Sequence, residues 1–229
     1  MGTIKKNQKN GRLSKVSVVI PTCNRYSVLL RNVENIREQK HPVEIVVCDD
    51  SLIEDYKTNH DLIKKIKNVV DQYHYTALYD HEQNKIYGLG RARNRGVIEA
   101  NGEIVVFLDD RITPANDKMV SVFVAKLNVS KNRSWLFGDK GAHKTSFVEN
   151  CSAVRRREII ISGMFPETIN SYGFMTREVY ARHRKQGFEF TYIPTALAKP
   201  LCTGSRRSSP ERQQKITLSR KKLRKMGLI

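Results

Sequence analysis

Three short apolar runs, each followed at once by polar or acidic residues, constrain the fold of this chain most strongly. The runs are rich in β-branched residues, as buried strands are, and they span Val16–Ile20, Glu44–Cys48 and Glu103–Leu108. Between and around them, apolar residues recur at helical spacing over residues 28–36, 62–70 and 91–100. Strands that alternate with helices in this way predict an α/β domain with a mostly parallel sheet flanked by helices on both faces.

The second half of the chain has a less regular pattern. We expect strands near residues 135–137 and 145–148, a helix over 177–186 that ends at Gly187, and a strand over 188–193. In the tail, Ser209-Pro210-Glu211 has the form of a helix start, because proline fits the first helical position. The chain therefore divides into a basic arm (1–15), one domain (16–202) and a basic tail or helix (203–229).

Net charge is the outlier of the composition, with 41 Lys and Arg against 23 Asp and Glu, or +18. Residues 1–15 carry +5 and residues 199–229 carry +9, which leaves +4 for residues 16–198. Basic ends on a nearly balanced body indicate a polyanionic partner, for which nucleic acid, an anionic membrane surface and an acidic polymer are the candidates.

Cysteine usage and the lack of an apolar segment bear on the compartment. The four cysteines are far apart in sequence and form no C-x-x-C pair, which favours a reducing compartment. The basic start is not followed by an apolar signal core, and no window approaches the roughly 18 apolar residues of a membrane span. We therefore expect a cytoplasmic protein, or one in the host cytoplasm if the chain is viral.

Two acidic pairs, Asp49-Asp50 and Asp109-Asp110, directly follow predicted strands. Because the carboxyl ends of parallel strands lie at one edge of a sheet, both pairs are expected where such folds bind ligands. Paired carboxylates are costly there unless a cation or hydrogen-bond donors meet them, and a nucleotide with its metal would do so. The alternative is that these aspartates cap the helices or loops that follow. Two such pairs favour the ligand site.

Four segments in order resemble the family-2 glycosyltransferases of the Rossmann-like GT-A fold. Val16–Arg25 is similar to the family's first strand and nucleotide-contacting turn, and Glu44–Ser51 to its second strand, whose acidic pair holds base and ribose. Gly90–Gly96 followed by Asn101–Asp110 resembles the segment that leads to the D-x-D element. The resemblance implies a nucleotide-sugar half (16–114) and an acceptor half (115–202), with a nucleoside diphosphate sugar, UDP in first place, as the donor.

The resemblance also implies the residues of the donor site. They lie in the turn after the first strand, after the second strand, in the helix over 91–100 and around the D-x-D element: Pro21, Thr22, Asn24, Arg25, Asp49, Asp50, Arg91, Arg93, Asn94, Asp109 and Arg111. Asp109 would face the ribose, and Asp110, with Asp109 beside it, would bind a divalent metal, Mn²⁺ or Mg²⁺. Such an ion neutralises the charge that develops on a diphosphate leaving group.

The sequence departs from the family pattern at three places. Arg111 stands at the third position of D-x-D, and Lys199-Pro200 stands where many members have a metal-binding histidine. We hypothesise that these fixed cations share or take over the task of the metal. Met175-Thr176 replaces the acidic pair that supplies the catalytic base in inverting members. Glu178 then becomes the nearest candidate base, unless it only balances its helix dipole, and Glu167 the second.

The remaining candidates concern the acceptor. Asn150–Glu158 is similar to the family's acceptor-side strand, and acceptor or phosphate contacts are expected from Asn150, Ser152, Tyr172, Lys199, Arg206 and Arg207. The basic ends favour DNA with a hydroxylated base slightly over a lipid-linked glycan at an anionic membrane, because the tail has few bulky apolar residues. A non-catalytic nucleic-acid-binding protein on a degenerate scaffold is the alternative that Arg111 and Met175-Thr176 leave open. The sequence does not indicate an oligomeric state.

Removal of residues 203–229 tests the choice between these polyanions. Because the segment carries nine basic residues and one acidic residue, its loss should weaken binding to duplex DNA and reduce the salt dependence of that binding. Fluorescence anisotropy at several salt concentrations measures both effects. Unchanged DNA binding, together with lost association with anionic vesicles, would favour the membrane.

Overall fold

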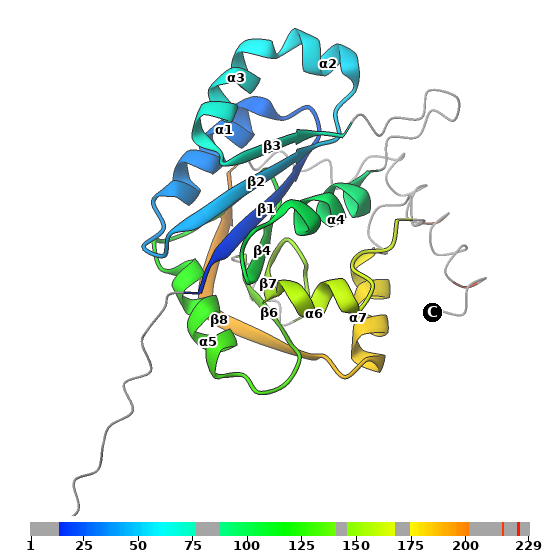
Figure 1. Ribbon diagram of the computed structural model, residues 1–229. Coiled ribbons are helices and arrows are strands. Elements are labelled where there is room, and N and C mark those ends of the chain that lie inside the picture. Colours follow the sequence, from blue (N-terminus) through cyan, green and yellow to red (C-terminus); the bar gives the residue numbers. More distant parts are fainter. Residues whose placement is uncertain are drawn as a thin grey trace, which may run out of the picture.

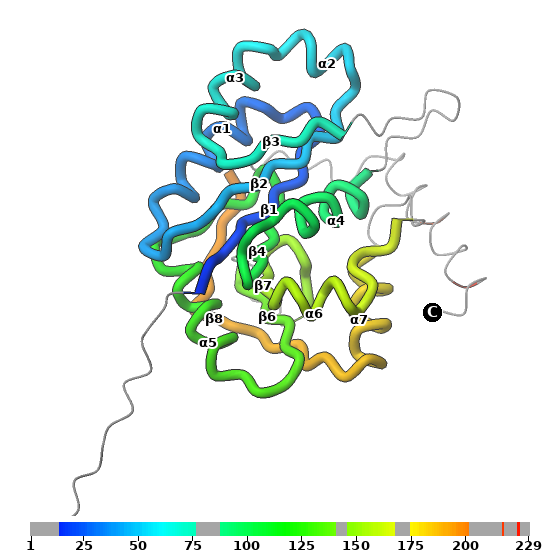
Figure 2. The backbone as a smooth tube through the Cα atoms, in the orientation of Figure 1, coloured from blue at the N-terminus to red at the C-terminus, as the bar shows by residue number. Residues whose placement is uncertain are grey.

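The computed structural model describes residues 14–76, 88–140, 146–167 and 175–201, together with positions 217 and 224. An eight-stranded sheet has the order β3-β2-β1-β4-β7-β6-β8-β5, with helices packed on both of its sides (Figures 1 and 2). The predicted fold class, a single α/β domain whose mostly parallel sheet is flanked by helices, is confirmed.

The first half of the sheet is parallel throughout. Its strands are β1 (Val16–Thr22), β2 (Val43–Asp49), β3 (Gln72–Tyr75) and β4 (Ile104–Leu108), with β1 between β2 and β4. Its helices are α1 (Tyr26–Arg37), α2 (Ile53–Thr58), α3 (His60–Val69) and α4 (Leu89–Glu99). The three apolar runs of the sequence are thus neighbouring strands, and the residues that follow them share one edge of the sheet.

The second half of the sheet mixes directions. β7 (Cys151–Arg155) is antiparallel to both β4 and β6 (Ser134–Asp139), whereas β8 (Glu189–Pro200) is parallel to β6. The short β5 (Ile112–Pro114) is antiparallel to the end of β8. Three helices complete this half, namely α5 (Met119–Val129), α6 (Arg156–Ile161) and α7 (Met175–Lys185).

The strand expected near residues 145–148 is wrong. Residues 146–148 lie in a bend and loop, and the strand begins later, at Cys151, where the family resemblance places it. The apolar signal comes from Phe147, whose ring packs against Trp135 and Phe190 at centroid distances of 5.4 and 4.6 Å. Burial of one side chain, and not strand pairing, therefore explains the hydrophobic pattern at this point.

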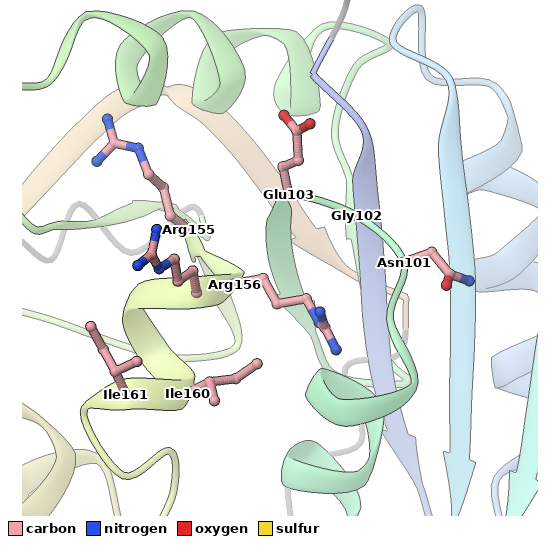
Figure 3. A pocket seen from close by; sticks show the side chains of 8 residues that line it. Asn101, Gly102, Glu103, Arg155, Arg156, Ile160 and Ile161 are labelled. Carbon is pink, nitrogen blue, oxygen red and sulfur yellow. The ribbon is translucent and has the colours of Figure 1, made fainter.

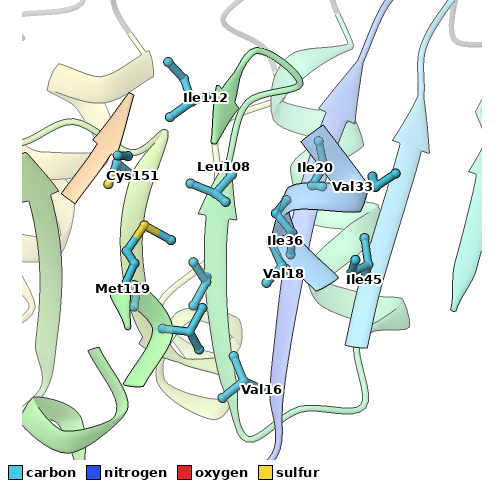
Figure 4. Close-up of a cluster of buried hydrophobic side chains, with 14 of the residues drawn as sticks. Val16, Val18, Ile20, Val33, Ile36, Ile45, Leu108, Ile112, Met119 and Cys151 are labelled. Carbon is cyan, nitrogen blue, oxygen red and sulfur yellow. The ribbon is translucent and has the colours of Figure 1, made fainter. Parts of the chain in front are cut away.

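The sheet separates two apolar clusters. On one face, β1, β2 and β4 pack against α1, α3 and α5 through residues such as Val18, Ile36 and Met119 (Figure 4). On the other face, Val19 and Phe107 pack against α4, α6 and α7. Because both faces of the central strands are covered, their sequences read as continuous apolar runs without alternation.

A close approach fixes α4 on β1. A Cβ atom at Gly96 would lie 2.3 Å from Cγ1 of Val19, so only glycine lets the helix backbone come this near the strand. This contact sets the height of α4 above the sheet, and α4 carries Arg93 and Asn94 toward the acidic edge.

Helix α7 carries a buried histidine, which lies beside the aromatic cluster around Trp135. His183 is 0 % exposed, its Nδ1 donates to the Val179 carbonyl at 2.8 Å, and its ring meets Trp135 edge-on at 5.1 Å. Burial, with a smaller contribution from Arg182, lowers the pKa of His183 from 6.5 to about 4. The imidazole is therefore neutral in the folded protein at physiological pH.

This histidine should make stability fall as the pH drops below 6.5. Between pH 6.5 and about 4 only the unfolded chain binds the proton, so this group lowers the unfolding free energy by up to about 1.4 kcal/mol per pH unit. The stabilising effect is complete above pH 6.5. Urea unfolding of the native protein and His183→Leu over this range measures the difference, which should be a shallower slope for the variant.

The same substitution at the exposed His60 controls for the loss of an imidazole from the unfolded chain. Equal slopes for the native protein and His183→Leu would contradict the assignment of this pH dependence to His183.

Candidate functional site

The loops after β1 and β2 are tied to each other at the carboxyl edge of the sheet. The Asp50 amide donates to the Thr22 carbonyl at 2.9 Å, and the Asn24 amide donates to Ser51 Oγ at 2.7 Å. Asn24 has a φ of 50°, in the left-handed region that asparagine tolerates better than most residues. The structure thus brings the predicted donor-site residues of both loops together.

Asp110 is buried and held by residues of the first loop. Its carboxylate accepts hydrogen bonds from Thr22 Oγ1 at 3.1 Å and from Arg25 Nη1 at 3.0 Å. Burial raises the pKa of Asp110, while the Arg25 guanidinium opposes that rise. The side chain of Arg25 is 50 % exposed and that of Asp110 only 2 %, so the cation of this pair borders solvent and the anion does not.

Asn32 of α1 fixes the turn that carries both aspartates. Its buried side-chain amide donates to the carbonyls of Asp109, Asp110 and Ile112 at 3.0–3.1 Å. Three carbonyls that point inward would otherwise lack these partners, so Asn32 determines the path of the chain after β4. Sequence reasoning missed Asn32, although a polar residue on the apolar face of the predicted helix was a usable signal.

Asp109 faces the second half of the sheet. Its Oδ1 accepts from Arg93 Nη2 at 2.9 Å and its Oδ2 accepts from Asn150 Nδ2 at 2.6 Å. The Asn150 side-chain oxygen in turn accepts from Lys140 Nζ. Burial lowers the pKa of the Lys140 ammonium, although Asp109 and Glu149 act in the opposite direction. Sequence reasoning missed Lys140, which belongs to no motif.

Glu149 joins the same cluster from the loop before β7. Its Oε1 accepts from Arg93 Nη1 at 3.1 Å, and its Oε2 accepts from the hydroxyl of Thr176 in the first turn of α7. Arg93 is 1 % exposed, and its guanidinium lies 5.3 Å from the centre of the Phe165 ring. One buried arginine therefore bridges a carboxylate after β4 and another before β7. Sequence reasoning missed Glu149 as well.

The two aspartates of the first acidic pair, Asp49 and Asp50, lie in different surroundings. Asp49 is 0 % exposed, and its carboxylate accepts from the hydroxyls of Tyr26, Tyr73 and Ser51 and from the Ser51 amide. The contacts with Ser51 match the alternative in which Asp49 caps the loop that follows it. Asp50 lies against Gly88, where a Cβ atom would come within 2.0 Å of Oδ2. The glycine at the start of α4 thus leaves room for the Asp50 carboxylate.

The two predicted bases lie in other surroundings. Glu178 pairs with Arg182 four residues later at 2.7 Å, and Arg182 also donates to the carbonyls of Ser162 and Met164. Glu167 accepts from Asn94 Nδ2 at 2.8 Å and lies 3.5 Å from Arg91 Nε. Neither glutamate has a contact with Asp109 or Asp110 among the hydrogen bonds and ion pairs of the described residues.

The cations expected near the metal, Arg111 and Lys199, have no contact with Asp109 or Asp110 among the hydrogen bonds and ion pairs of the described residues. β5 and β8 pair so that Thr113 is opposite Lys199, and the Leu201 amide donates to the Arg111 carbonyl. The cations that touch the D-x-D carboxylates in the described ranges are instead Arg25 and Arg93.

Two of the other predicted site residues are buried, and three lie outside the part of the chain that the structure describes. Ser152 is fully buried, where it accepts from the Trp135 indole and donates to the Glu149 carbonyl, and Pro21 is buried within β1. Tyr172, Arg206 and Arg207 lie outside the described residues.

The residues present fit a divalent metal that shares its ligands with a donor. Asp109 and Asp110 offer the carboxylates of two consecutive residues, and Mg²⁺ and Mn²⁺ prefer oxygen ligands of this kind. Such sites commonly use one or two carboxylates together with substrate phosphates. Within residues 14–76, 88–140, 146–167 and 175–201, no group of three or more His, Cys, Asp or Glu residues forms a metal site. Phosphate and water oxygens would have to complete the coordination.

A separate pocket of about 470 Å³ lies at the opposite edge of the sheet, where β4 begins and β7 ends (Figure 3). Arg155 and Arg156 line it, but their guanidinium groups donate to backbone carbonyls. Arg155 donates to α5 and to the segment after it, and Arg156 donates to the last turn of α4. These arginines stabilise helix ends. The carboxylate cluster at the carboxyl edge remains the candidate site.

The described part of the chain contains no helix that is both long and apolar enough to cross a membrane.

Comparison with known sequences points to one family. The family model described as Glycosyl transferase family 2 matches residues 17–132. A GalNAc(5)-diNAcBac-PP-undecaprenol beta-1,3-glucosyltransferase from Campylobacter jejuni is 28% identical over 130 residues, which cover 56% of this chain and 38% of that protein. An uncharacterized glycosyltransferase from Rickettsia bellii is 32% identical over 99 residues, 43% of this chain and 13% of that protein. The chain thus spans less than half of either relative.

Comparison with solved structures agrees on the fold. Mannosyltransferase PcManGT from Pyrobaculum calidifontis, in complex with GDP-Man and Mn²⁺, has a TM-score of 0.67 and 16% identity over 93% of this chain and 65% of that chain. TarS from S. aureus has a TM-score of 0.61 and 16% identity over 81% of this chain and 60% of that chain. At this identity the likeness supports the fold alone.

Replacement of Asn32 should loosen the turn that presents the aspartates. Asn32→Leu keeps the volume but removes the donor to three carbonyls, so the unfolding free energy should fall by about 2 kcal/mol. Amide hydrogen exchange should accelerate at Ile112, whose amide closes the turn onto the Asp109 carbonyl. Asn68→Leu, at an exposed position of α3, is the matched control. Native-like exchange at Ile112 in Asn32→Leu would contradict this role.

Proposed function

The chain belongs to glycosyl transferase family 2, and on that premise we propose that it transfers a sugar from a nucleoside diphosphate sugar to a hydroxyl group of a polyanionic acceptor. The observation that carries the proposal is the convergence of Asp50, Asp109 and Asp110 at the carboxyl edge of three adjacent parallel strands. Ligands of open α/β sheets bind at this edge.

The donor lies, in this proposal, across the loops after β1, β2 and β4. Asp50 and Asp109 would accept hydrogen bonds from base and ribose. The Arg25 guanidinium, half exposed beside Asp110, would pair with the diphosphate. Helix α4 also reaches this edge, and its residues Arg91 and Asn94 contact Glu167. UDP is our proposal for the nucleotide.

Asp109 and Asp110 would hold the divalent ion that the fold family implies. When bound, Mn²⁺ or Mg²⁺ would neutralise negative charge on the diphosphate leaving group. Arg25 occupies one side of Asp110, so its side chain must share that carboxylate with the ion or turn toward the phosphates. The hypothesis that Arg111 and Lys199 replace the metal draws no support from contacts with the acidic pair in the described ranges, which places Arg25 first among the cations to test.

The charge of the chain ends supports a polyanionic acceptor, and we keep DNA with a hydroxylated base as the first candidate. A base within a duplex would have to be unpaired or flipped out to reach the sugar. The second candidate is a lipid-linked glycan at an anionic membrane, because the Campylobacter relative is named for an undecaprenol-linked substrate. A non-catalytic nucleic-acid-binding protein remains the competing class.

Calorimetry with UDP, UDP-glucose, GDP and GDP-mannose tests the proposal. We expect one nucleotide to bind more tightly with Mn²⁺ than with EDTA, because the aspartates and the diphosphate would share the ion. Asp110→Asn should weaken that binding about tenfold or more. The Asp71→Asn variant is the matched control, since Asp71 pairs with Arg37 at 2.6 Å outside the site.

Two results would count against the proposal. If none of the four nucleotides binds, the non-catalytic nucleic-acid-binding protein is favoured. Equal affinity with Mn²⁺ and EDTA would overturn the metal assignment. A mass-spectrometric screen of sugar transfer to modified DNA and to lipid extracts then decides between the acceptors.

A further inference from the structure

We propose that Glu149 is the general base that removes the proton from the acceptor hydroxyl. The inference rests on the proposed function, because it names the residue that acts on the acceptor in that reaction. It differs from the expectation drawn from the sequence, in which Glu178 or Glu167 takes this role.

The position of Glu149 follows from the direction of β7. Because β7 is antiparallel to β4, with Cys151 opposite Leu108, the residues just before β7 lie beside those just after β4. Glu149 and Asn150 therefore reach the carboxyl edge next to Asp109. Asn150 contacts Asp109 directly at 2.6 Å, and Glu149 contacts it through Arg93.

The Arg93 guanidinium fixes the distance between donor side and acceptor side. Its Nη2 holds Asp109, which we assign to the donor, and its Nη1 holds Glu149. The side chain of Arg93 is 1 % exposed, whereas those of Asp109 and Glu149 are 22 % and 13 % exposed. The arginine is thus the buried support, and the two carboxylates border the solvent on either side of it.

Glu149 supplies a carboxylate at the start of α7, although the helix itself begins without an acid. The helix begins with Met175-Thr176, which carries no acid, but the Thr176 hydroxyl donates to Glu149 Oε2. The loop before β7 therefore places an acid next to the helix start. This contact also orients the carboxylate from its second oxygen.

The groups around Glu149 come from two helices and two loops. They are Arg93 of α4, Asp109 after β4, Lys140 after β6 and Thr176 of α7. Glu178 pairs with Arg182, which in turn donates to the segment after α6, and Glu167 lies beside Arg91 with 47 % of its side chain exposed. Of these three glutamates, Glu149 is the one that shares a buried cation with Asp109.

The reaction step balances with this one residue as base. The acceptor oxygen forms a bond to the anomeric carbon of the sugar, and the bond from that carbon to the diphosphate oxygen breaks with its electron pair on the diphosphate. The acceptor proton passes to a carboxylate oxygen of Glu149 and then to solvent. One such displacement inverts the anomeric configuration.

Donor hydrolysis provides a test without knowledge of the acceptor, because water then takes the place of the hydroxyl. The probe is whichever of UDP-glucose and GDP-mannose the native protein hydrolyses faster. Glu149→Gln should lower this rate at least 100-fold and leave the nucleotide dissociation constant within about twofold. Glu158→Gln is the matched control, since Glu158 is also partly buried and pairs with Arg155 at 3.1 Å outside the site.

Azide separates a base from a residue that only shapes the site. It attacks the anomeric carbon through nitrogen and has no proton to lose, so Glu149→Ala with azide should form glycosyl azide, visible by mass spectrometry, at a rate near that of the native protein. Melting curves of both Glu149 variants show whether they are folded. Glu149→Asp, in which the carboxylate is retained but set back, should keep part of the activity.

Two outcomes overturn the inference while the proposed function stands. The first is a Glu149→Gln variant that hydrolyses the donor at the rate of the native protein. The second is a folded Glu149→Ala variant whose activity azide does not restore. A 100-fold loss in Glu178→Gln or Glu167→Gln, with Glu149→Gln unaffected, would return the role to that residue. If the native protein neither binds nor hydrolyses a sugar nucleotide, the proposed function fails and this inference falls with it.

Discussion

The buried guanidinium of Arg93 is the interaction on which the arrangement of the site depends. It joins Asp109, at the end of the parallel half of the sheet, to Glu149, at the entrance of the antiparallel strand. A charge that is 1 % exposed is stable only with such partners, since removal of one member of a buried pair commonly costs about 3–5 kcal/mol. The two halves of the domain are thus coupled through an ion pair as well as through the sheet.

The same principle accounts for the other carboxylates at this edge. Asp110 has Arg25 and Thr22, whereas Asp49 has three hydroxyls and a backbone amide. The protein offsets the cost of desolvating its acids in two ways, with the cations Arg25 and Arg93 at Asp110 and Asp109 and with neutral donors at Asp49. This difference separates Asp109 and Asp110, which we assign to the donor and its ion, from Asp49, whose carboxylate accepts from three hydroxyls and the Ser51 amide.

The sequence was sufficient to predict the central strands, because they are buried on both faces and carry an unbroken apolar signal. It was also sufficient to place Asp49, Asp50, Asp109 and Asp110 at one edge, since the carboxyl ends of parallel strands coincide. It was insufficient for Asn32, whose partners lie 77–80 residues away, and for Glu149, whose partners lie 27 and 56 residues away. It was also insufficient for Lys140, whose hydrogen bond to Asn150 belongs to no motif. The strand expected at 145–148 failed because one buried phenylalanine imitated a strand pattern.

The reversed direction of β7 determines which segments of the chain can vary in sequence without disturbing the donor side of the site. In a purely parallel sheet, the site is assembled from residues that follow strands, and each of them is tied to the strand before it. The antiparallel β7 admits the segment that precedes a strand, here Glu149 and Asn150, into the same edge. The residues that we assign to the two substrates therefore belong to separate stretches of chain. Changes in the segment before β7 would alter the acceptor side and leave the β1–β4 layer intact as long as Glu149 still meets Arg93 and Asn150 still meets Asp109.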